Sequence, residues 1–363
     1  MISETITGPH DRAENDQFPH EHVRLLPPQV RQALEFPRLR ENIWHIAEDE
    51  PLAYVETLTG VFEVPTSQAV SFLKVRSHCT GLNSIAEIAA RSGVCATDIR
   101  SMVLNLFAAD LLLPSQDSPP QPEESLDSIR LKLRSIGEVW GKELTRDYVA
   151  NKLLTDDLPK EVLVGWLLEM YHYVRDFPEA IQHGAQAAAG PLRKLFLRYA
   201  GEERGHEEFV LRALVNLGLK RSEVEASTPL VSTRLVGLLM RELFELEPAT
   251  VLLVAAIIEA HEIPEEQLNG FQRQLESRYD LPKETLGPYF EHQFIDVALG
   301  HSKLLEDNID LFSVRDPKLL DAIVNKIHDL KHAFELQSQE IQSYYGNLGG
   351  MYLPRQPLTF SSL

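Results

Sequence analysis

Two residues near the middle of the chain have the types and the spacing of metal ligands. Glu203 and His206 lie in the segment 192–217, on a stripe of apolar positions that recurs every three or four residues. On a helix this stripe faces the core, where a carboxylate and an imidazole need a counter-charge, a hydrogen-bond network or a metal ion. Residues three apart are neighbours on a helix and could hold one ion. A buried Glu-His hydrogen bond is the alternative, and this segment alone does not decide between them.

Three further predicted helices also place polar residues among apolar neighbours. The first carries Glu169, and the second carries Glu259, which follows an eight-residue apolar run. An exposed helix end is the alternative interpretation for Glu259 because a proline follows soon after it. The third carries His292 and Asp296, which are one turn apart, together with His301.

His301 is the difficult member of this group. Nine residues of ideal helix turn it half a turn away from His292. A π-bulge near Leu299 and Gly300 would bring it back to the same side as Asp296. If His301 faces solvent instead, we expect one tightly bound ion rather than two.

The interior polar residues of the four segments form one chemically consistent set. Carboxylates combined with imidazoles suit iron or manganese, and helical bundles use such sets for two-metal oxygen chemistry. Zinc, which takes fewer ligands, fits less well. The predicted catalytic and metal-binding residues are Glu169, Glu203, His206, Glu259, His292, Asp296 and His301.

The elements that must position these residues are helices. From residue 126 onward the apolar pattern has the helical period throughout, and it indicates no strand. This predicts an all-α domain over 126–363. Its helices are expected at 126–144, 146–154, 159–176, 178–186, 190–217, 230–244, 247–261, 264–278, 282–309 and 316–345.

The preceding residues predict a small α/β domain over 21–114. Segments 42–46 and 52–58 have the pattern of short strands, and helices are expected at 69–77, 84–91 and 97–106. Ser84 is the expected N-cap of the second helix, Gly93 its C-terminal stop, and Thr97 or Asp98 the cap of the third. Residues 1–20 are predicted to be a flexible tail, and the proline-rich 115–125 a linker.

Composition narrows the class of protein. The net charge of −19 disfavours binding to nucleic acid or to an anionic membrane. Cys79 and Cys95 are too few for a disulfide framework, and neither a signal peptide nor an 18-residue apolar span is apparent. We therefore expect a cytoplasmic protein. A homodimer is left open.

Two segments resemble the ligand segments of the heme-oxygenase-like diiron oxidases, iron-containing redox enzymes related to the pyrroloquinoline quinone synthase and thiaminase-II folds. GEERGHEEF carries Glu203 and His206, and HQFIDVALGH carries His292, Asp296 and His301. The resemblance covers about residues 127–345. It implies that Glu169 is the carboxylate of the first helix and Glu259 the one upstream of the histidine segment. The three-residue spacing of Glu203 and His206 departs from many relatives, which leaves the subfamily and the substrate open.

The resemblance also implies an activity. Two ferrous ions would use dioxygen to oxidise an amine, an amino acid or a carboxylate, often with C–C or C–N cleavage or N-oxygenation. Such enzymes serve natural-product biosynthesis. Four tyrosines flank the predicted ligands and could orient a substrate, although core packing is the favoured role. They are Tyr171, Tyr173, Tyr199 and Tyr289.

The segment FLKVRSHCTGLNSIAEIAARSGV, placed between strands and a third helix, resembles the winged-helix PqqD-like domains that bind leader peptides of ribosomal peptides. DNA binding is disfavoured because residues 21–113 hold 8 Lys and Arg against 11 Asp and Glu. An exposed strand edge could bind a peptide instead. An inert docking domain is the alternative.

Two other interpretations compete with the diiron oxidase. A ferritin-like site would pair Glu169 with His172 and Glu203 with His206, leaving the His292 segment unexplained. A metal-free peptide-binding or scaffold protein would use the buried Glu-His pairs for structure only. Iron content per chain separates these classes.

Overall fold

The computed structural model describes residues 27–40, 44–49, 51–58, 60–113, 124–258, 264–349 and 354–362. The chain divides into two compact units. The first comprises the described parts of Met1–Asn42, Glu48–Ala53 and Glu63–Pro120, and the second those of Ile43–Ala47, Tyr54–Phe62 and Gln121–Leu363. The expected tail at 1–20, nearly all of the expected linker and Glu259 lie outside the described residues.

Ahead of residue 114 the described chain forms four helices and one small sheet. The helices are α2 (Pro28–Glu35), α3 (Thr66–Arg76), α4 (Ile85–Ser92) and α5 (Ala96–Ala108). The strands β1 (His45–Asp49), β2 (Leu52–Glu56) and β3 (Val61–Pro65) lie in the order β1-β2-β3. The sequence predicted two of these strands and three of these helices. It missed β3, which begins directly after Gly60 and ends at Pro65, two residues that are typical of breaks in the chain. The Gly60 carbonyl accepts a hydrogen bond from the Thr57 amide at 2.9 Å.

The ends of α4 follow the predicted capping chemistry. The Ser84 hydroxyl accepts a hydrogen bond from the Glu87 amide at 3.3 Å, and the Glu87 carboxylate accepts one from the Ser84 amide at 2.8 Å. Gly93 ends the helix with a φ of 71°, a conformation that favours glycine. The predicted cap of α5 was wrong: Cys95 occupies the N-cap, without a side-chain hydrogen bond, and Thr97 and Asp98 lie inside the helix.

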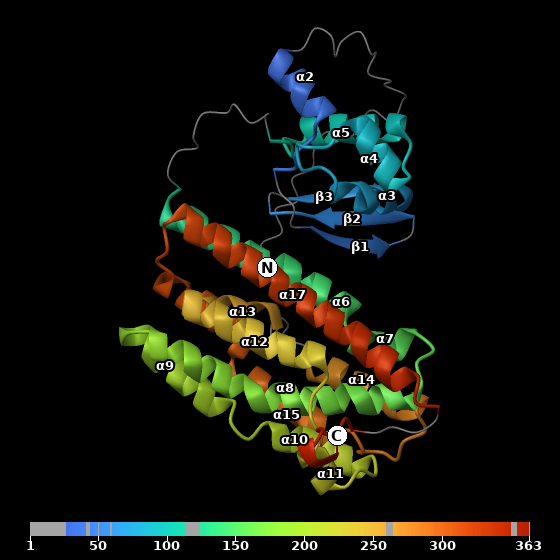
Figure 1. The fold of residues 1–363 in the computed structure, drawn as a ribbon, viewed down its shortest axis with the longest axis vertical. Coiled ribbons are helices and arrows are strands. Elements are labelled where there is room, and N and C mark those ends of the chain that lie inside the picture. The colour runs from blue at the N-terminus through green and yellow to red at the C-terminus, as the bar shows by residue number, and fades with distance from the viewer. Residues whose placement is uncertain are drawn as a thin grey trace. The chain divides into compact units, whose positions relative to one another are not determined.

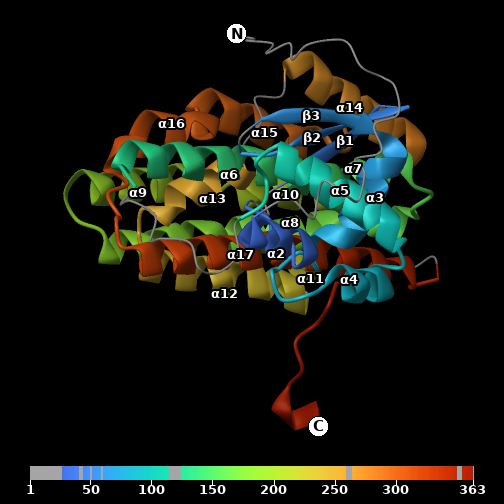
Figure 2. The ribbon, with the colours of Figure 1, turned by 90° about the horizontal axis from the view of Figure 1, so that it is seen from above.

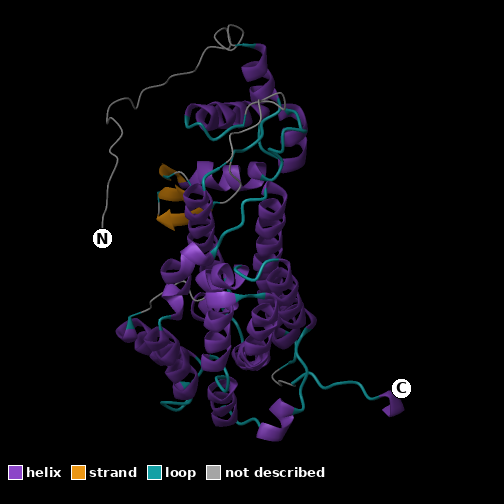
Figure 3. Ribbon diagram, turned by 90° about the vertical axis from the view of Figure 1, so that its left-hand side faces the viewer, coloured by secondary structure: helices purple, strands orange, loops and turns teal. Residues whose placement is uncertain are grey.

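The second unit is helical after residue 124, which confirms the predicted fold class of a mainly α protein with a small α/β region. Figure 3 shows that the strands of the described chain are confined to the one small sheet. None of the helices in the described ranges is long and apolar enough to cross a membrane. The longer helices are α6 (Leu126–Asp147), α8 (Lys160–Ala187), α9 (Gly190–Glu202), α10 (Glu207–Asn216), α12 (Val231–Leu246), α13 (Thr250–Ile258), α14 (Glu265–Arg278), α15 (Gly287–Leu299) and α17 (Pro317–Gly346).

Short helices connect these elements, namely α7 (Val149–Thr155), α11 (Arg221–Glu225), α16 (Leu304–Asn308) and the 3-10 turns η1 (His301–Lys303) and η2 (Ile309–Leu311); a further 3-10 turn, η3 (Phe360–Ser362), follows the last long helix. Arg355 fixes the C-terminal segment: its carbonyl accepts a hydrogen bond from the Thr228 amide at 2.7 Å. Beyond it, the segment leads away from the helices (Figure 2).

Helix α8 is the central element of this unit. It contacts α9, α10, α12 and α17, and Figure 1 shows α6, α8, α12 and α17 running along one another. Gly165 allows α8 and α17 to pack closely, because a Cβ at this position would lie 2.2 Å from the Tyr345 ring of α17. The sequence predicted separate helices at 159–176 and 178–186, but α8 runs through Pro178, which is buried inside it. Tertiary packing therefore outweighs the cost of an interior proline, about 3 kcal/mol.

Candidate metal centre

Four of the predicted ligands converge in the helical unit. Glu203, His206, His292 and Asp296 each offer one donor atom, and these atoms all lie within 4.8 Å of one another. The Asp296 carboxylate contacts His206 Nδ1 at 3.3 Å and His292 Nε2 at 3.2 Å. The two imidazoles pack edge-on, with His292 Nε2 3.1 Å from His206 Nδ1.

Glu203 and His206 lie in a turn between two helices, not on the face of one continuous helix. The sequence predicted one helix over 190–217, but α9 ends at Glu202 and α10 begins at Glu207. Gly205 makes the intervening turn possible with a φ of 89°, which L side chains rarely adopt. Glu203 Oε2 remains 3.5 Å from His206 Nδ1, so the pair is adjacent as expected, although the predicted helix was wrong.

His301 joins the cluster by a different route from the predicted π-bulge. Helix α15 ends at Leu299, and Gly300 turns the chain with a φ of 73° into the 3-10 turn η1. This conformation is open to glycine and redirects the next side chain inward. His301 is 2% exposed and its Nδ1 lies 2.9 Å from Glu203 Oε1.

His301 has two further neighbours, and the sequence predicted only one of them. Glu202 Oε2 lies 3.4 Å from His301 Nε2, and the Tyr199 ring packs edge-on with its centre 4.7 Å from that of the imidazole. Tyr199 was expected to flank the ligands. Nothing in the sequence indicated that Glu202 belongs to the site. On the continuous helix that was predicted, adjacent residues point in different directions, so Glu202 would not lie on the same face as Glu203.

Opposite charges dominate the electrostatics of the cluster. Burial raises the pKa of the Glu203 carboxyl, but the neighbouring His206 and His301 outweigh it and lower the pKa to about 2. Burial lowers the pKa of His206, yet contacts with Asp296 and Glu203 raise it to about 9. Burial lowers the pKa of His292. At neutral pH the metal-free cluster therefore holds an ionised Glu203 beside a protonated His206.

The donor atoms fit a metal ion. Glu203 Oε1 and Asp296 Oδ1 are buried and accept no hydrogen bond of ordinary geometry, although imidazole nitrogens lie close to both. Buried carboxylate oxygens without such bonds are costly, and coordination of a cation satisfies them. Oxygen and imidazole nitrogen are the ligands that iron and manganese take in helical bundles.

Glu169 does not lie in this cluster. Its carboxylate is 1% exposed and accepts hydrogen bonds from the Leu230 amide at 2.9 Å, Thr233 Oγ1 at 2.6 Å and the Tyr345 hydroxyl at 2.9 Å. Burial raises the pKa of Glu169. The structure thus gives this predicted ligand a full set of hydrogen-bond partners between α8, α12 and α17.

The second Glu-His pair of the ferritin-like alternative also lies outside the cluster. His172 is buried outside the cluster, where its Nε2 lies 2.8 Å from the Ser227 hydroxyl. Burial lowers its pKa to about 3. Glu169 and His172 consequently do not form a second metal pair with Glu203 and His206.

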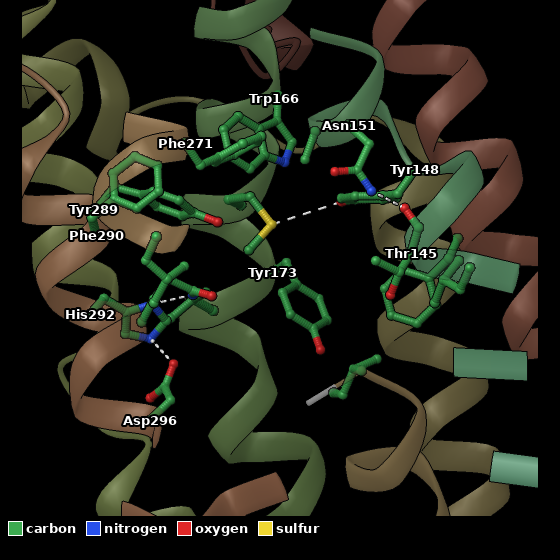
Figure 4. Close-up of a pocket in the computed structure, with 18 of the residues that line it drawn as sticks. Thr145, Tyr148, Asn151, Trp166, Tyr173, Phe271, Tyr289, Phe290, His292 and Asp296 are labelled. Carbon is green, nitrogen blue, oxygen red and sulfur yellow. Dashed lines mark hydrogen bonds and ion pairs between the residues drawn. The ribbon is translucent and has the colours of Figure 1, made fainter. Parts of the chain in front are cut away.

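A cavity of about 560 Å³ adjoins the cluster. Glu203, His292 and Asp296 form part of its wall, and the remaining wall is mostly aromatic and aliphatic. Figure 4 shows His292 and Asp296 on one side of this space and Trp166 with Tyr148 on the other. Of the tyrosines expected near the ligands, Tyr173 and Tyr289 line the cavity. Sequence periodicity could mark the other wall residues only as core, because it does not distinguish a packed face from one that borders a cavity.

A family model matches part of the helical unit. Residues 164–333 match the model of the family described as iron-containing redox enzymes. No curated protein matches the chain. A solved domain of unknown function with a heme oxygenase-like fold from Shewanella denitrificans OS217 is similar at 16% identity and a TM-score of 0.47, over 65% of this chain and 100% of that one. The segment that carries Glu203, His206, His292, Asp296 and His301 thus lies within a match to the heme-oxygenase-like, iron-containing redox enzymes.

Proposed function

We propose that the protein is a non-heme diiron oxidase that uses dioxygen to oxidise an amino-acid-derived or peptide substrate in natural-product biosynthesis. The observation that carries the proposal is the convergence of Glu203, His206, His292 and Asp296 beside the cavity, with His301 2.9 Å from Glu203. The family match over 164–333 supports an iron-dependent oxidoreductase.

The residues that would hold iron follow from the contacts. His206, His292 and Asp296 cluster on one side of Glu203, and His301 contacts its other oxygen. Glu203, His206, His292, Asp296 and His301 are therefore the residues that would hold iron. Iron and dioxygen together supply the oxidising power that no side chain provides.

The chain itself contributes placement and exclusion of water. Glu203 and Asp296 supply negative charge that offsets a bound cation in a poorly solvated site. The aromatic wall formed by Trp166, Tyr289 and Phe290 keeps a substrate against the His292 side of the cavity and displaces water from it. Imidazoles held by carboxylates keep the orientation that ligation requires.

We also propose a peptide-binding role for the region before residue 114. The strand order places β3 at an edge of the sheet, and Val61 on β3 is 63% exposed. An extended peptide could add to such an edge through backbone hydrogen bonds. A leader peptide bound there would raise the local concentration of its own substrate segment.

The test is an anaerobic Fe(II) titration of the full chain and of two variants. His206→Ala and His292→Ala should each lose iron binding, because each removes a ligand, while helical content by circular dichroism stays near that of the wild type. His172→Ala is the matched control, since this buried histidine lies outside the cluster, and it should bind iron as the wild type does. Full iron content in His292→Ala would overturn the assignment. A wild-type chain that binds no iron would favour the metal-free scaffold.

A further inference from the structure

The cavity wall has a chemical character that narrows the class of ligand. Aromatic and aliphatic side chains make up most of it, and its most exposed residues, Thr145 and Gln267, are polar but uncharged. Among the described residues that line it, Glu203 and Asp296 are acidic and none is Lys or Arg. An anionic group would find no Lys or Arg there, and the protonated His206 is already paired with both carboxylates, at 3.5 and 3.3 Å.

One polar group of the wall lacks a partner. The Trp166 indole is 2% exposed, and its Nε1 makes no hydrogen bond. The neighbouring Tyr148 hydroxyl contacts the indole, and it donates its own proton to Gln337 Oε1 at 3.1 Å. A buried indole N–H usually has an acceptor, so an unmatched one bordering a cavity points to a ligand atom that completes it.

The position of Trp166 gives this donor a use. Figure 4 places Trp166 across the cavity from Asp296, so a ligand that accepts its hydrogen bond extends from there toward the metal cluster. The Tyr289 ring packs edge-on against the indole with the ring centres 5.0 Å apart and fixes its orientation. The volume of about 560 Å³ is within the range of small-molecule sites.

We infer that the cavity binds an uncharged, aromatic or aliphatic group carrying a hydrogen-bond acceptor, such as a carbonyl or ether oxygen, which takes the indole N–H of Trp166. The inference rests on the proposed function in that the cavity is taken as the substrate site. Trp166 is then a specificity-determining residue: it selects the acceptor at the far end of the group and leaves the other end facing Glu203 and Asp296.

Three probes of similar shape test this on the full-length, metal-free chain. Benzophenone has a carbonyl acceptor, diphenylmethane lacks it, and 4-benzoylbenzoate adds a negative charge. By equilibrium dialysis, benzophenone should bind about five- to tenfold more tightly than diphenylmethane, the ratio expected for one hydrogen bond. The anion should bind at least about tenfold more weakly than benzophenone, because Glu203 and Asp296 repel it and their neighbouring cation, His206, is already paired with them.

Two tryptophan variants locate the effect. Trp166→Phe should weaken benzophenone binding to the level of diphenylmethane and leave diphenylmethane within about twofold. Trp140→Phe is the matched control, since Trp140 is equally buried but packs on His328 rather than lining the cavity. It should leave both dissociation constants unchanged. An unchanged benzophenone preference in Trp166→Phe, or tight binding of the anion, would overturn the inference.

Photolabelling of the wild type tests the site even if the Trp166→Phe variant does not fold. Irradiated benzophenone bonds covalently to nearby C–H groups, and peptide mapping of the wild type should find the adduct on cavity residues such as Met170. Adducts found only outside the cavity would reject the site. These measurements need no iron, so they separate failure of the ligand inference from failure of the metal assignment.

Discussion

Replacing Glu169 distinguishes a metal ligand from a structural carboxylate. In Glu169→Ala the Leu230 amide, the Thr233 hydroxyl and the Tyr345 hydroxyl all lose their acceptor in a buried site. Each unsatisfied buried donor costs about 1–3 kcal/mol, although Thr233 and Tyr345 have hydroxyls that can turn toward other acceptors. We therefore expect the free energy of unfolding of the helical unit to fall by about 3 kcal/mol or more, while iron content per chain stays near that of the wild type.

The assay combines urea denaturation, followed by circular dichroism, with iron analysis of the folded protein. Glu179→Ala is the matched control on the same helix: its carboxylate is exposed and pairs only at the surface with Arg241, at 3.3 Å. Removing it should change stability by no more than about 0.5 kcal/mol. If Glu169→Ala instead loses iron and keeps wild-type stability, Glu169 is a ligand, as its resemblance to the first-helix carboxylate implied, and the structural role is refuted.

Two further predictions concern the cluster itself. Gly300→Ala should destabilise the protein by about 1 kcal/mol through its φ of 73° alone, since its Cβ meets no atom within 4 Å, and should weaken iron binding by displacing His301. The helical Gly201→Ala, equally free of contacts, should instead stabilise it; equal effects of the two in denaturation would contradict this account. Because His206 has a pKa of about 9 and Glu203 one of about 2, metal binding near pH 7 should displace about one proton, from His206, so affinity should rise with pH up to about 9. Anaerobic calorimetry in buffers of different ionisation enthalpy counts that proton, and a count near zero would show that His206 is neutral or not a ligand.

The polar residues of the cluster could be found from the sequence because they interrupt apolar stripes. Periodicity predicted that Glu203, His206 and His292 face the interior; in the structure these three residues are buried, and their donor atoms lie near one another and near Asp296. Periodicity could not predict that helices are interrupted at Gly205 and Gly300, because a single residue with positive φ leaves the surrounding apolar pattern intact. For His301 a π-bulge and a left-handed glycine have the same consequence, and only the backbone distinguishes them.

The role of Glu169 shows where sequence reasoning stops. The apolar stripe correctly indicated that its carboxylate is buried, since it is 1% exposed. Its partners, however, come from residues 61 to 176 positions away in the chain, Leu230, Thr233 and Tyr345. A buried carboxylate in one sequence predicts that a partner exists and does not say whether it is a metal or a hydroxyl.

The two helix breaks also make the cluster a better cation site than a continuous helix would. Glu203 is the C-terminal cap of α9, and His301 lies two residues beyond the end of α15, so two helix C-termini lie at the cluster. The unpaired carbonyl groups at such ends carry partial negative charge and favour a cation. The opposing positive end of α10, at His206, is offset by Glu207 and Glu208 in its first turn. The helix ends and the carboxylates therefore both stabilise positive charge at the cluster. An anionic substrate would consequently need the bound metal ion as its counter-charge.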